Sequence, residues 1–96
     1  MEILKMSVKL MSIVFDLSLA PVDKLTLLVL ADVADESGLC WPSQKYIARR
    51  ATISQRSVQR VLNRLSGAGL IRVEKRTRAD GSQTSNYYHL DLGRTK

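Results

Sequence analysis

Apolar residues recur at helical spacing in three successive segments of this 96-residue chain, and the spacing changes to alternation after Gly69. Helical spacing produces one apolar face that packs into a core, whereas alternation is typical of a strand with one buried face. Domains contain about 50 to 250 residues, so a chain of this length has room for one. The order of these patterns predicts a mainly α domain that ends in a β-hairpin.

The first predicted helix covers 21–36, with Pro21 in its first turn and Gly38 as a stop signal beyond it. Proline suits the first turn because the N–H it lacks would be unpaired there, and glycine is common just after a helix. A second helix is predicted to follow Ser43, whose side chain can cap it. Its narrow apolar face consists of Ile47, Ala48 and Ala51. Between these helices, 40–42 is predicted to be extended, since the residue before a proline avoids the helical region.

The third predicted helix follows Ser54, another candidate N-cap, and ends near Gly67 and Gly69. Its inward face has apolar residues at i, i+3, i+4 and i+7, namely Val58, Val61, Leu62 and Leu65. Its outward face has polar and basic side chains, namely Gln55, Arg56, Ser57, Gln59, Arg60, Asn63 and Arg64. This helix is therefore predicted to combine a buried face with one that can hydrogen-bond a partner.

Two alternating segments, 70–77 and 85–92, predict the hairpin, because a turn signal at Asp80 and Gly81 lies between them. The N-terminal residues 1–17 are predicted to form an arm. Alternation within it favours a strand-like conformation, with a helix as the alternative, at Met11, Ile13, Phe15 and Leu17. The domain division expected from these patterns is an arm over 1–17, the folded domain over 18–92 and a tail over 93–96.

Positive charge is concentrated in the middle of the chain. The net charge is +6, from 15 Lys and Arg against 9 Asp and Glu. Residues 45–78 contain ten basic residues and one acid, Glu74, whereas 1–44 carry a net charge of −3 and 79–96 carry none. A basic segment with so little internal neutralisation attracts a polyanion. No segment combines a basic stripe with a broad exposed apolar face, so nucleic acid is favoured over a membrane surface.

Several classes of site are excluded by what the sequence lacks. Cys40 is the only cysteine, and His89 has no cysteine or carboxylate set near it, so we expect no disulfide, metal, cofactor or catalytic triad. The most apolar stretch, 25–31, is far shorter than the roughly 20 residues that cross a bilayer. We therefore expect a non-enzymatic protein of the cytoplasm, in a bacterium or in the host of a phage. Trp41 and Tyr46 are predicted to be core residues.

Three helices followed by a basic hairpin form the order of a winged helix-turn-helix, in which the third helix enters the DNA major groove. The dimensions agree, because a helix with side chains is about 10 to 12 Å across and the groove about 12 Å wide. The predicted base-contacting residues are Gln55, Arg56, Ser57, Gln59 and Arg60. Arginines of this face can contact guanine, and the amides of Gln55, Gln59 and Asn63 can pair with adenine. Arg64 is predicted to contact phosphate instead.

The second helix and the hairpin are predicted to hold the DNA backbone without specifying its sequence. On and before the second helix, the backbone contacts are expected from Ser43, Lys45, Arg49 and Arg50. The hairpin would act as the wing, reaching backbone or minor groove through Arg76, Arg78 and Ser82.

The chain resembles the winged helix-turn-helix domain found at the front of many phage and plasmid replication initiators and in related mobile-element regulators. The resemblance rests on LADVADESGLCWPS (30–43), IARRATISQRSVQRVLNRLSGAGLI (47–71) and SNYYHL (85–90). It implies the same fold and a role in transcription control or replication initiation. The chain differs from this family at Thr52, where the inter-helix turn usually has glycine. It also ends at Lys96, so a stand-alone regulator, an excised domain and a complete initiator are all expected alternatives.

The sequence therefore predicts a sequence-specific protein for double-stranded DNA that acts by occupying its site. A different class of function is the alternative, namely a winged-helix module that binds an acidic replication or transcription protein. A single module recognises a short site, so a homodimer is expected, with the arm from Val8 to Leu17 as its contact. Packing of this arm on its own chain is the other interpretation.

Overall fold

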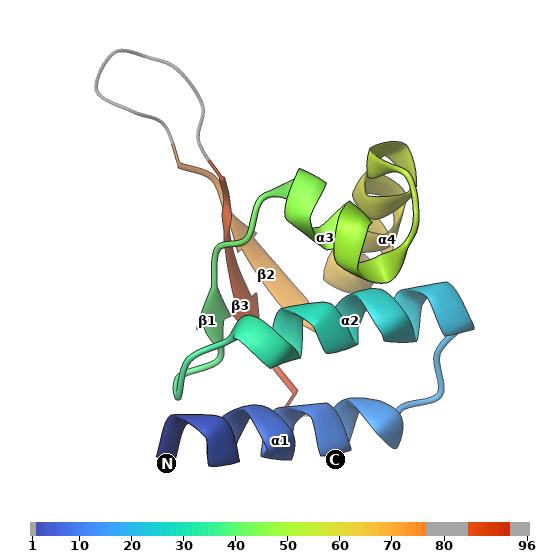
Figure 1. Cartoon of the computed structure of the whole chain (residues 1–96). Helices are drawn as coiled ribbons and strands as arrows, with labels where there is room; N and C mark the ends of the chain where they lie inside the picture. Colours follow the sequence, from blue (N-terminus) through green and yellow to red (C-terminus); the bar gives the residue numbers. More distant parts are fainter. Residues whose placement is uncertain (1, 77–84, 93–96) are drawn as a thin grey trace.

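The computed structural model describes residues 2–76 and 85–92. Within them the elements follow in the order α1 (Glu2–Phe15), α2 (Pro21–Val33), β1 (Leu39–Cys40), α3 (Gln44–Ala51), α4 (Gln55–Gly67), β2 (Ile71–Glu74) and β3 (Tyr87–Leu90). The three helices α2, α3 and α4 pack together on one side, and a small antiparallel sheet lies beside them (Figure 1). This mixed α and β arrangement confirms the predicted winged helix-turn-helix fold.

The three predicted helices form where the caps and apolar spacing place them. Pro21 begins α2, and the hydroxyl oxygens of Ser43 and Ser54 accept hydrogen bonds from backbone N–H groups at the starts of α3 and α4, both at 3.0 Å. The predicted inward face of α4 is buried throughout, at Val58, Val61, Leu62 and Leu65. That of α3 is also buried, at Ile47, Ala48 and Ala51. Burial of these faces against α2 fixes the orientation of α4 relative to the other helices.

The sheet has the strand order β1-β3-β2, with β3 antiparallel to both neighbours. Val73 lies opposite Tyr88 in the β2–β3 pair, and Tyr88 is 1 % exposed. One face of the sheet is thus packed on the helices, as the alternation predicted. β1 adds a third strand to the predicted hairpin. The predicted Asp80-Gly81 turn lies outside the described residues.

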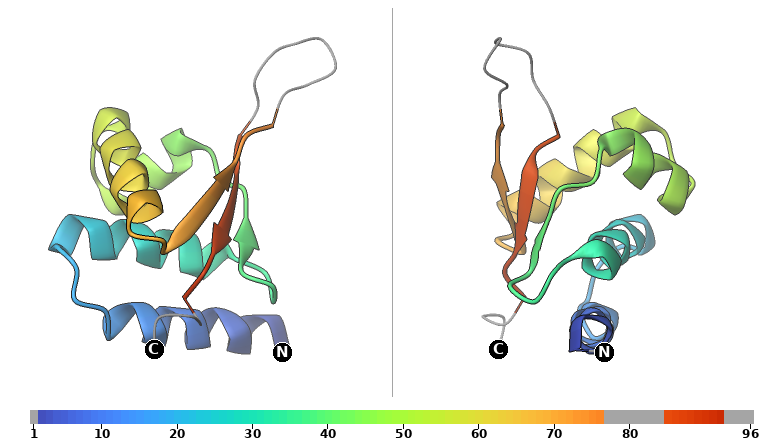
Figure 2. Two further views of the ribbon diagram at one scale, coloured as in Figure 1. Left: turned by 180° about the vertical axis from the view of Figure 1, so that it is seen from behind. Right: turned by 60° about the vertical axis from the view of Figure 1, so that its left-hand side comes forward.

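The N-terminal arm is a helix, so the strand-like prediction for 1–17 was wrong. Helical spacing places Val14 in the core at 0 % exposure, with Leu10 and Leu17 packed against it from the same face. Phe15, which the alternating pattern placed on one side with Met11, Ile13 and Leu17, is 62 % exposed. α1 lies along α2 on the side away from α3 and α4, so it packs on its own chain (Figure 2).

Two local features differ from the prediction around the α2–β1 connection. α2 ends at Val33 rather than Glu36, because the Asp35 carboxylate accepts hydrogen bonds from the backbone N–H groups of Ser37 and Leu39 and holds a turn. A hydrogen bond from the Ser37 hydroxyl, together with these backbone bonds, lowers the pKa of Asp35. Trp41 is 51 % exposed, so its predicted core position was wrong, whereas Tyr46 is half-buried against the core.

The turn between α3 and α4 has the left-handed backbone that glycine usually provides. Thr52 has φ 59° and ψ 45° and is the one non-glycine residue with positive φ in the described part of the chain. The backbone N–H of Thr52 bonds to the carbonyl of Ala48, and that of Ile53 bonds to the same carbonyl at 3.0 Å. A β-branched residue thus occupies a left-handed conformation that is costly for any residue other than glycine.

Replacing Thr52 with glycine is expected to stabilise the protein. The left-handed conformation costs an L-residue roughly 1 to 2 kcal/mol, and the greater unfolded-state entropy of glycine offsets roughly 0.5 to 1 kcal/mol of that gain. The free energy of unfolding should rise by up to about 1 kcal/mol, which corresponds to about 4 to 8 °C in Tm for a domain of this size. Thermal unfolding followed by circular dichroism measures this. Thr52→Ala is the control, since it keeps the strain, and an equal gain in both variants would contradict this explanation.

Candidate nucleic-acid interface

The outward face of α4 is open to solvent. Among its seven predicted contact residues, six are exposed and Ser57 is half-buried. The Ser57 hydroxyl accepts a hydrogen bond from the Ser54 hydroxyl at 3.0 Å, so this side chain belongs to the cap of α4. The face is therefore free for a partner along most of the helix, beginning at its capped N-terminus.

Arg56 and Arg60 are the free cations of this face. Both are exposed, and neither forms an ion pair with any residue that the structure describes. They lie one turn apart in the N-terminal half of α4, so their guanidinium groups project from the same side. No described residue accepts a hydrogen bond from either guanidinium, so their donors can reach guanine edges or phosphate oxygens.

Arg64, one turn further along, is held by α2. Its Nε donates to Asp23 Oδ2 at 3.0 Å and its Nη2 to Asp23 Oδ1 at 2.7 Å, a bidentate pair. The Asp23 side chain is 10 % exposed, and the Arg64 side chain is 53 % exposed. These hydrogen bonds raise the pKa of Arg64. The expectation that the basic segment is little neutralised does not hold here, because the acid comes from a distant part of the chain.

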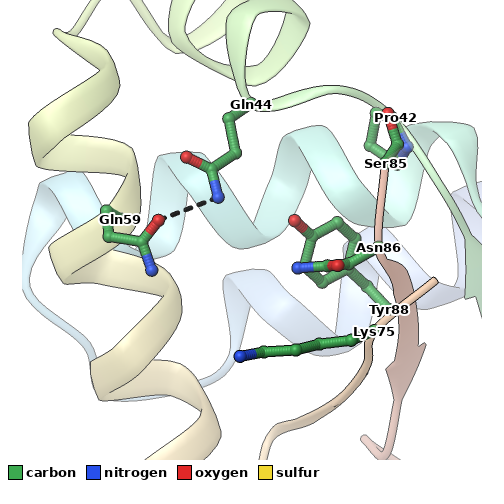
Figure 3. Close-up of a pocket in the computed structure, with 7 residues that line it drawn as sticks. All are labelled: Pro42, Gln44, Gln59, Lys75, Ser85, Asn86 and Tyr88. Atoms are coloured by element: carbon green, nitrogen blue, oxygen red, sulfur yellow. Dashed lines mark hydrogen bonds between the residues drawn. The ribbon is translucent and has the colours of Figure 1, made fainter. Parts of the chain in front are cut away.

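The carboxamide of Gln59 is also engaged. Gln44 Nε2 at the start of α3 donates to Gln59 Oε1 at 2.9 Å (Figure 3). Bidentate pairing with adenine needs the oxygen as acceptor and the nitrogen as donor at once. In this arrangement the Gln59 oxygen already has a partner within the protein, whereas Gln55 and Asn63 are exposed without one among the described residues.

Two of the four predicted backbone contacts on and before α3 lie beside the ring of Tyr46. The guanidinium carbons of Arg49 and Arg50 each lie 5.9 Å from the centre of the Tyr46 ring, and Arg50 is 3.7 Å from the Asp32 carboxylate. Lys45 is exposed with no ion pair to a described residue. Ser43 is exposed, and its oxygen caps α3. These four residues thus lie at both ends of α3, with Lys45 the least constrained.

The wing, defined as β2, β3 and their connection, holds Arg76 in place. Its Nε donates to the Ser85 carbonyl at 2.7 Å, and its guanidinium lies 4.4 Å from the centre of the Tyr87 ring. Tyr87 in turn contacts Trp41 edge-on at 6.0 Å. Arg76, which follows β2, therefore contacts the β3 side of the wing at its base. Arg78 and Ser82 lie outside the described residues.

Lys75 and Asn86 face α4 from the base of the wing and are not among the residues predicted from the sequence (Figure 3). Alternation along β2 could have identified Lys75, because Ile71 and Val73 point toward the helices and Lys75 continues that side. Asn86 had no such signal. With Gln44, these residues extend the polar surface from α4 onto the wing.

The other reactive groups are in structural positions. Burial raises the pKa of Cys40 to about 12, so its thiol stays protonated, and it donates to the Tyr88 carbonyl at 3.7 Å. His89 does have a carboxylate neighbour, since its Nε2 lies 2.8 Å from Glu74 on the adjacent strand. Across the part of the chain that is described, no group of three or more His, Cys, Asp or Glu side chains could hold a metal ion. No helix in that part is long and apolar enough to span a bilayer.

The comparison with known families agrees with this geometry. A family model described as a helix-turn-helix domain matches residues 17–71, which is more than half of the chain. The chain is a member of this helix-turn-helix family. No curated protein has significant sequence similarity to it. Its helix-turn-helix consists of α3, the turn at Thr52 and α4, and the match ends at Ile71, where the wing begins.

The helix-turn-helix assigns roles to the surfaces described above. In this motif the second helix, here α4, lies in the major groove of duplex DNA while the first crosses the backbone. The family thus indicates DNA binding, and domains of this type are typically non-enzymatic. The free arginines lie on the helix that the motif directs toward DNA, and the paired Arg64 lies at its far end.

Proposed function

We propose that the protein binds double-stranded DNA at a specific sequence and acts by occupying that site. The observation that carries the proposal is the exposed face of α4, where Arg56 and Arg60 have no ion-pair partner among the described residues. An exposed arginine without an ion-pair partner on this helix can donate two hydrogen bonds to guanine O6 and N7. Arg56, Arg60 and Gln55 are the proposed base contacts, and Asn63 extends the same face.

Backbone contacts complete the proposed interface. Lys45, Arg49 and Arg50 on α3 supply positive charge beside α4, and Ser43 lies at the start of the same helix. These contacts would hold many sequences equally. The biological setting proposed is transcription control or replication-origin binding in a phage, plasmid or other mobile element, which rests on the resemblance of residues 30–43, 47–71 and 85–90 to such proteins.

A homodimer is part of the proposal, because one helix-turn-helix covers too short a site to be distinguished in a genome. On α1, Val8 and Phe15 are apolar and more than half exposed, which supports α1 as the contact between copies. Selection of bound duplexes from a random pool tests this together with specificity. Two inverted half-sites in the selected sequences would support the dimer, and a single asymmetric element would contradict it.

The salt dependence of binding tests the electrostatic part of the proposal. If the interface neutralises about six phosphates, log Kobs should fall against log salt concentration with a slope of about −5. Fluorescence anisotropy of a labelled selected duplex between low and physiological salt measures this slope. A slope near zero would contradict the charged interface. Absence of binding to every duplex at low salt would favour the other function, a module for an acidic replication or transcription protein.

A further inference from the structure

A polar hollow of about 460 Å³ lies between the α3–α4 pair and the base of the wing (Figure 3). We call it the wing-base hollow. Its helical side consists of Gln44 and Gln59, and its other side consists of Pro42, Lys75, Ser85, Asn86 and Tyr88. One water occupies about 30 Å³ in the liquid, so the hollow has room for a much larger polar group.

The lining of the wing-base hollow suits an anion. Three carboxamides, two hydroxyls and one ammonium line it, and Lys75 is the one charged residue among the described lining residues. Glu74, the acid next to Lys75 in the sequence, points to the opposite face of the sheet and lies 2.8 Å from His89. Lys75 forms no ion pair with a described residue. Its ammonium is therefore an uncompensated charge beside a set of hydrogen-bond donors.

A buried tyrosine and a hydrogen-bonded glutamine pair line opposite sides of the hollow. Tyr88 is 1 % exposed, and this burial raises its pKa, an effect that the polar side chains of Gln44 and Asn86 partly offset. Gln44 also donates to Gln59 of α4. The Gln44–Gln59 bond thus joins α3 to α4 on the helical side, and Tyr88 and Asn86 line the wing side opposite it. A preformed gap of this kind binds its ligand with little reorganisation.

The geometry of duplex DNA identifies what passes through such a gap. The major and minor grooves, about 12 and 6 Å wide, are separated by one sugar-phosphate strand. A protein with a helix in the major groove and a wing over the adjacent minor groove must therefore hold that strand between the two elements. We propose, resting on the proposed function, that the wing-base hollow holds a phosphodiester of this strand, with Lys75 as its counter-charge and the Asn86 amide as a donor.

Substitution of Lys75 tests the site. Lys75→Gln should weaken binding of all duplexes by a similar factor, about tenfold at low salt, and should reduce the magnitude of the salt slope by about 1. Arg72→Gln is the matched control, since it removes one exposed charge from the opposite face of β2 and should change neither value beyond a factor of about two. Equal effects of the two substitutions would overturn the proposal. Both side chains are exposed, and circular dichroism checks that both variants fold.

Neutral phosphate substitution locates the contact. In a duplex scanned with single methylphosphonates, one position on the strand between the grooves should weaken the wild type and leave Lys75→Gln unaffected, because the contact is already lost. Additive losses in this variant at every position would overturn the assignment to the DNA backbone. A second arm titrates inorganic phosphate and deoxythymidine monophosphate without DNA, followed by NMR. Submillimolar binding that depends on Lys75 would assign the hollow to a free phosphate ligand and overturn the backbone site.

The result also separates this inference from the function on which it rests. If the wild-type protein binds no duplex at low salt, both fail together. If the wild type binds DNA with the expected slope and Lys75→Gln binds with the same affinity and slope, only the phosphate site fails.

Discussion

Replacing Arg60 with alanine is expected to weaken binding to the selected duplex by about 1 to 3 kcal/mol, which is roughly 5- to 150-fold. Arg60 lies on the exposed face of α4 and has no ion pair with a described residue, so the substitution leaves no buried charge behind. Its guanidinium can contact guanine O6 and N7 together, and alanine can replace neither bond. Titration by fluorescence anisotropy, on the selected duplex and on duplexes with single base changes, measures both affinity and preference.

The control for Arg60→Ala is Arg72→Ala, which removes the same charge from the outer face of the sheet. We expect Arg72→Ala to bind nearly as the wild type does. We also expect Arg60→Ala to lose preference at one or two adjacent base pairs and to keep it elsewhere. If the loss were the same on selected and random duplexes, Arg60 would be a phosphate contact and the proposed base contact would be wrong.

The helical part of the fold was predictable because its signals are local. Serine caps, Pro21 and the apolar spacing of Val58 to Leu65 each depend on residues within a few turns of one another. The strand-like prediction for α1 was wrong for the same reason, because it too used only local signals. Its apolar residues satisfy both a period of two and a period of about 3.6 over a short stretch, and only packing against α2 decides between them.

The site was predictable as a surface but not in its internal contacts. The outward residues of α4 follow from the helical period alone. Their partners come from distant segments, since Asp23 is 41 residues from Arg64 and Gln44 is 15 residues from Gln59. A charge count within the basic segment cannot detect an acid that tertiary packing supplies. Arg76 was assigned to DNA on charge, whereas its contacts with Tyr87 and Ser85 depend on the hairpin register.

The paired Arg64 gives α4 a fixed attachment to α2, in addition to its apolar face. The bond between Asp23 and Arg64 is the one bidentate ion pair among the described residues. It lies where α4 would otherwise be held by side-chain packing alone at Val61 and Leu65. Because the angle of α4 decides which base pairs its outward residues reach, this pair is a positioning contact for recognition.

Asp23→Ala is accordingly expected to reduce the free energy of unfolding by about 1.5 to 3 kcal/mol, the range for hydrogen bonds to charged groups. The value lies below that for fully buried pairs, because the Arg64 side chain is 53 % exposed and water can solvate it once Asp23 is gone. For a domain of this size, Tm should fall by about 4 to 8 °C per kcal/mol. Thermal and urea unfolding measure the change.

Asp16→Ala is the control for this prediction, since Asp16 is exposed after α1 and its carboxylate has no partner among the described residues. It removes the same charge from the chain, so any general effect of net charge appears in both variants. Binding provides a second readout, because release of Arg64 adds a free cation to α4. We expect the salt slope of Asp23→Ala to become steeper by about 1 while base preference weakens. A stability equal to that of Asp16→Ala would mean that apolar packing alone holds α4 on α2.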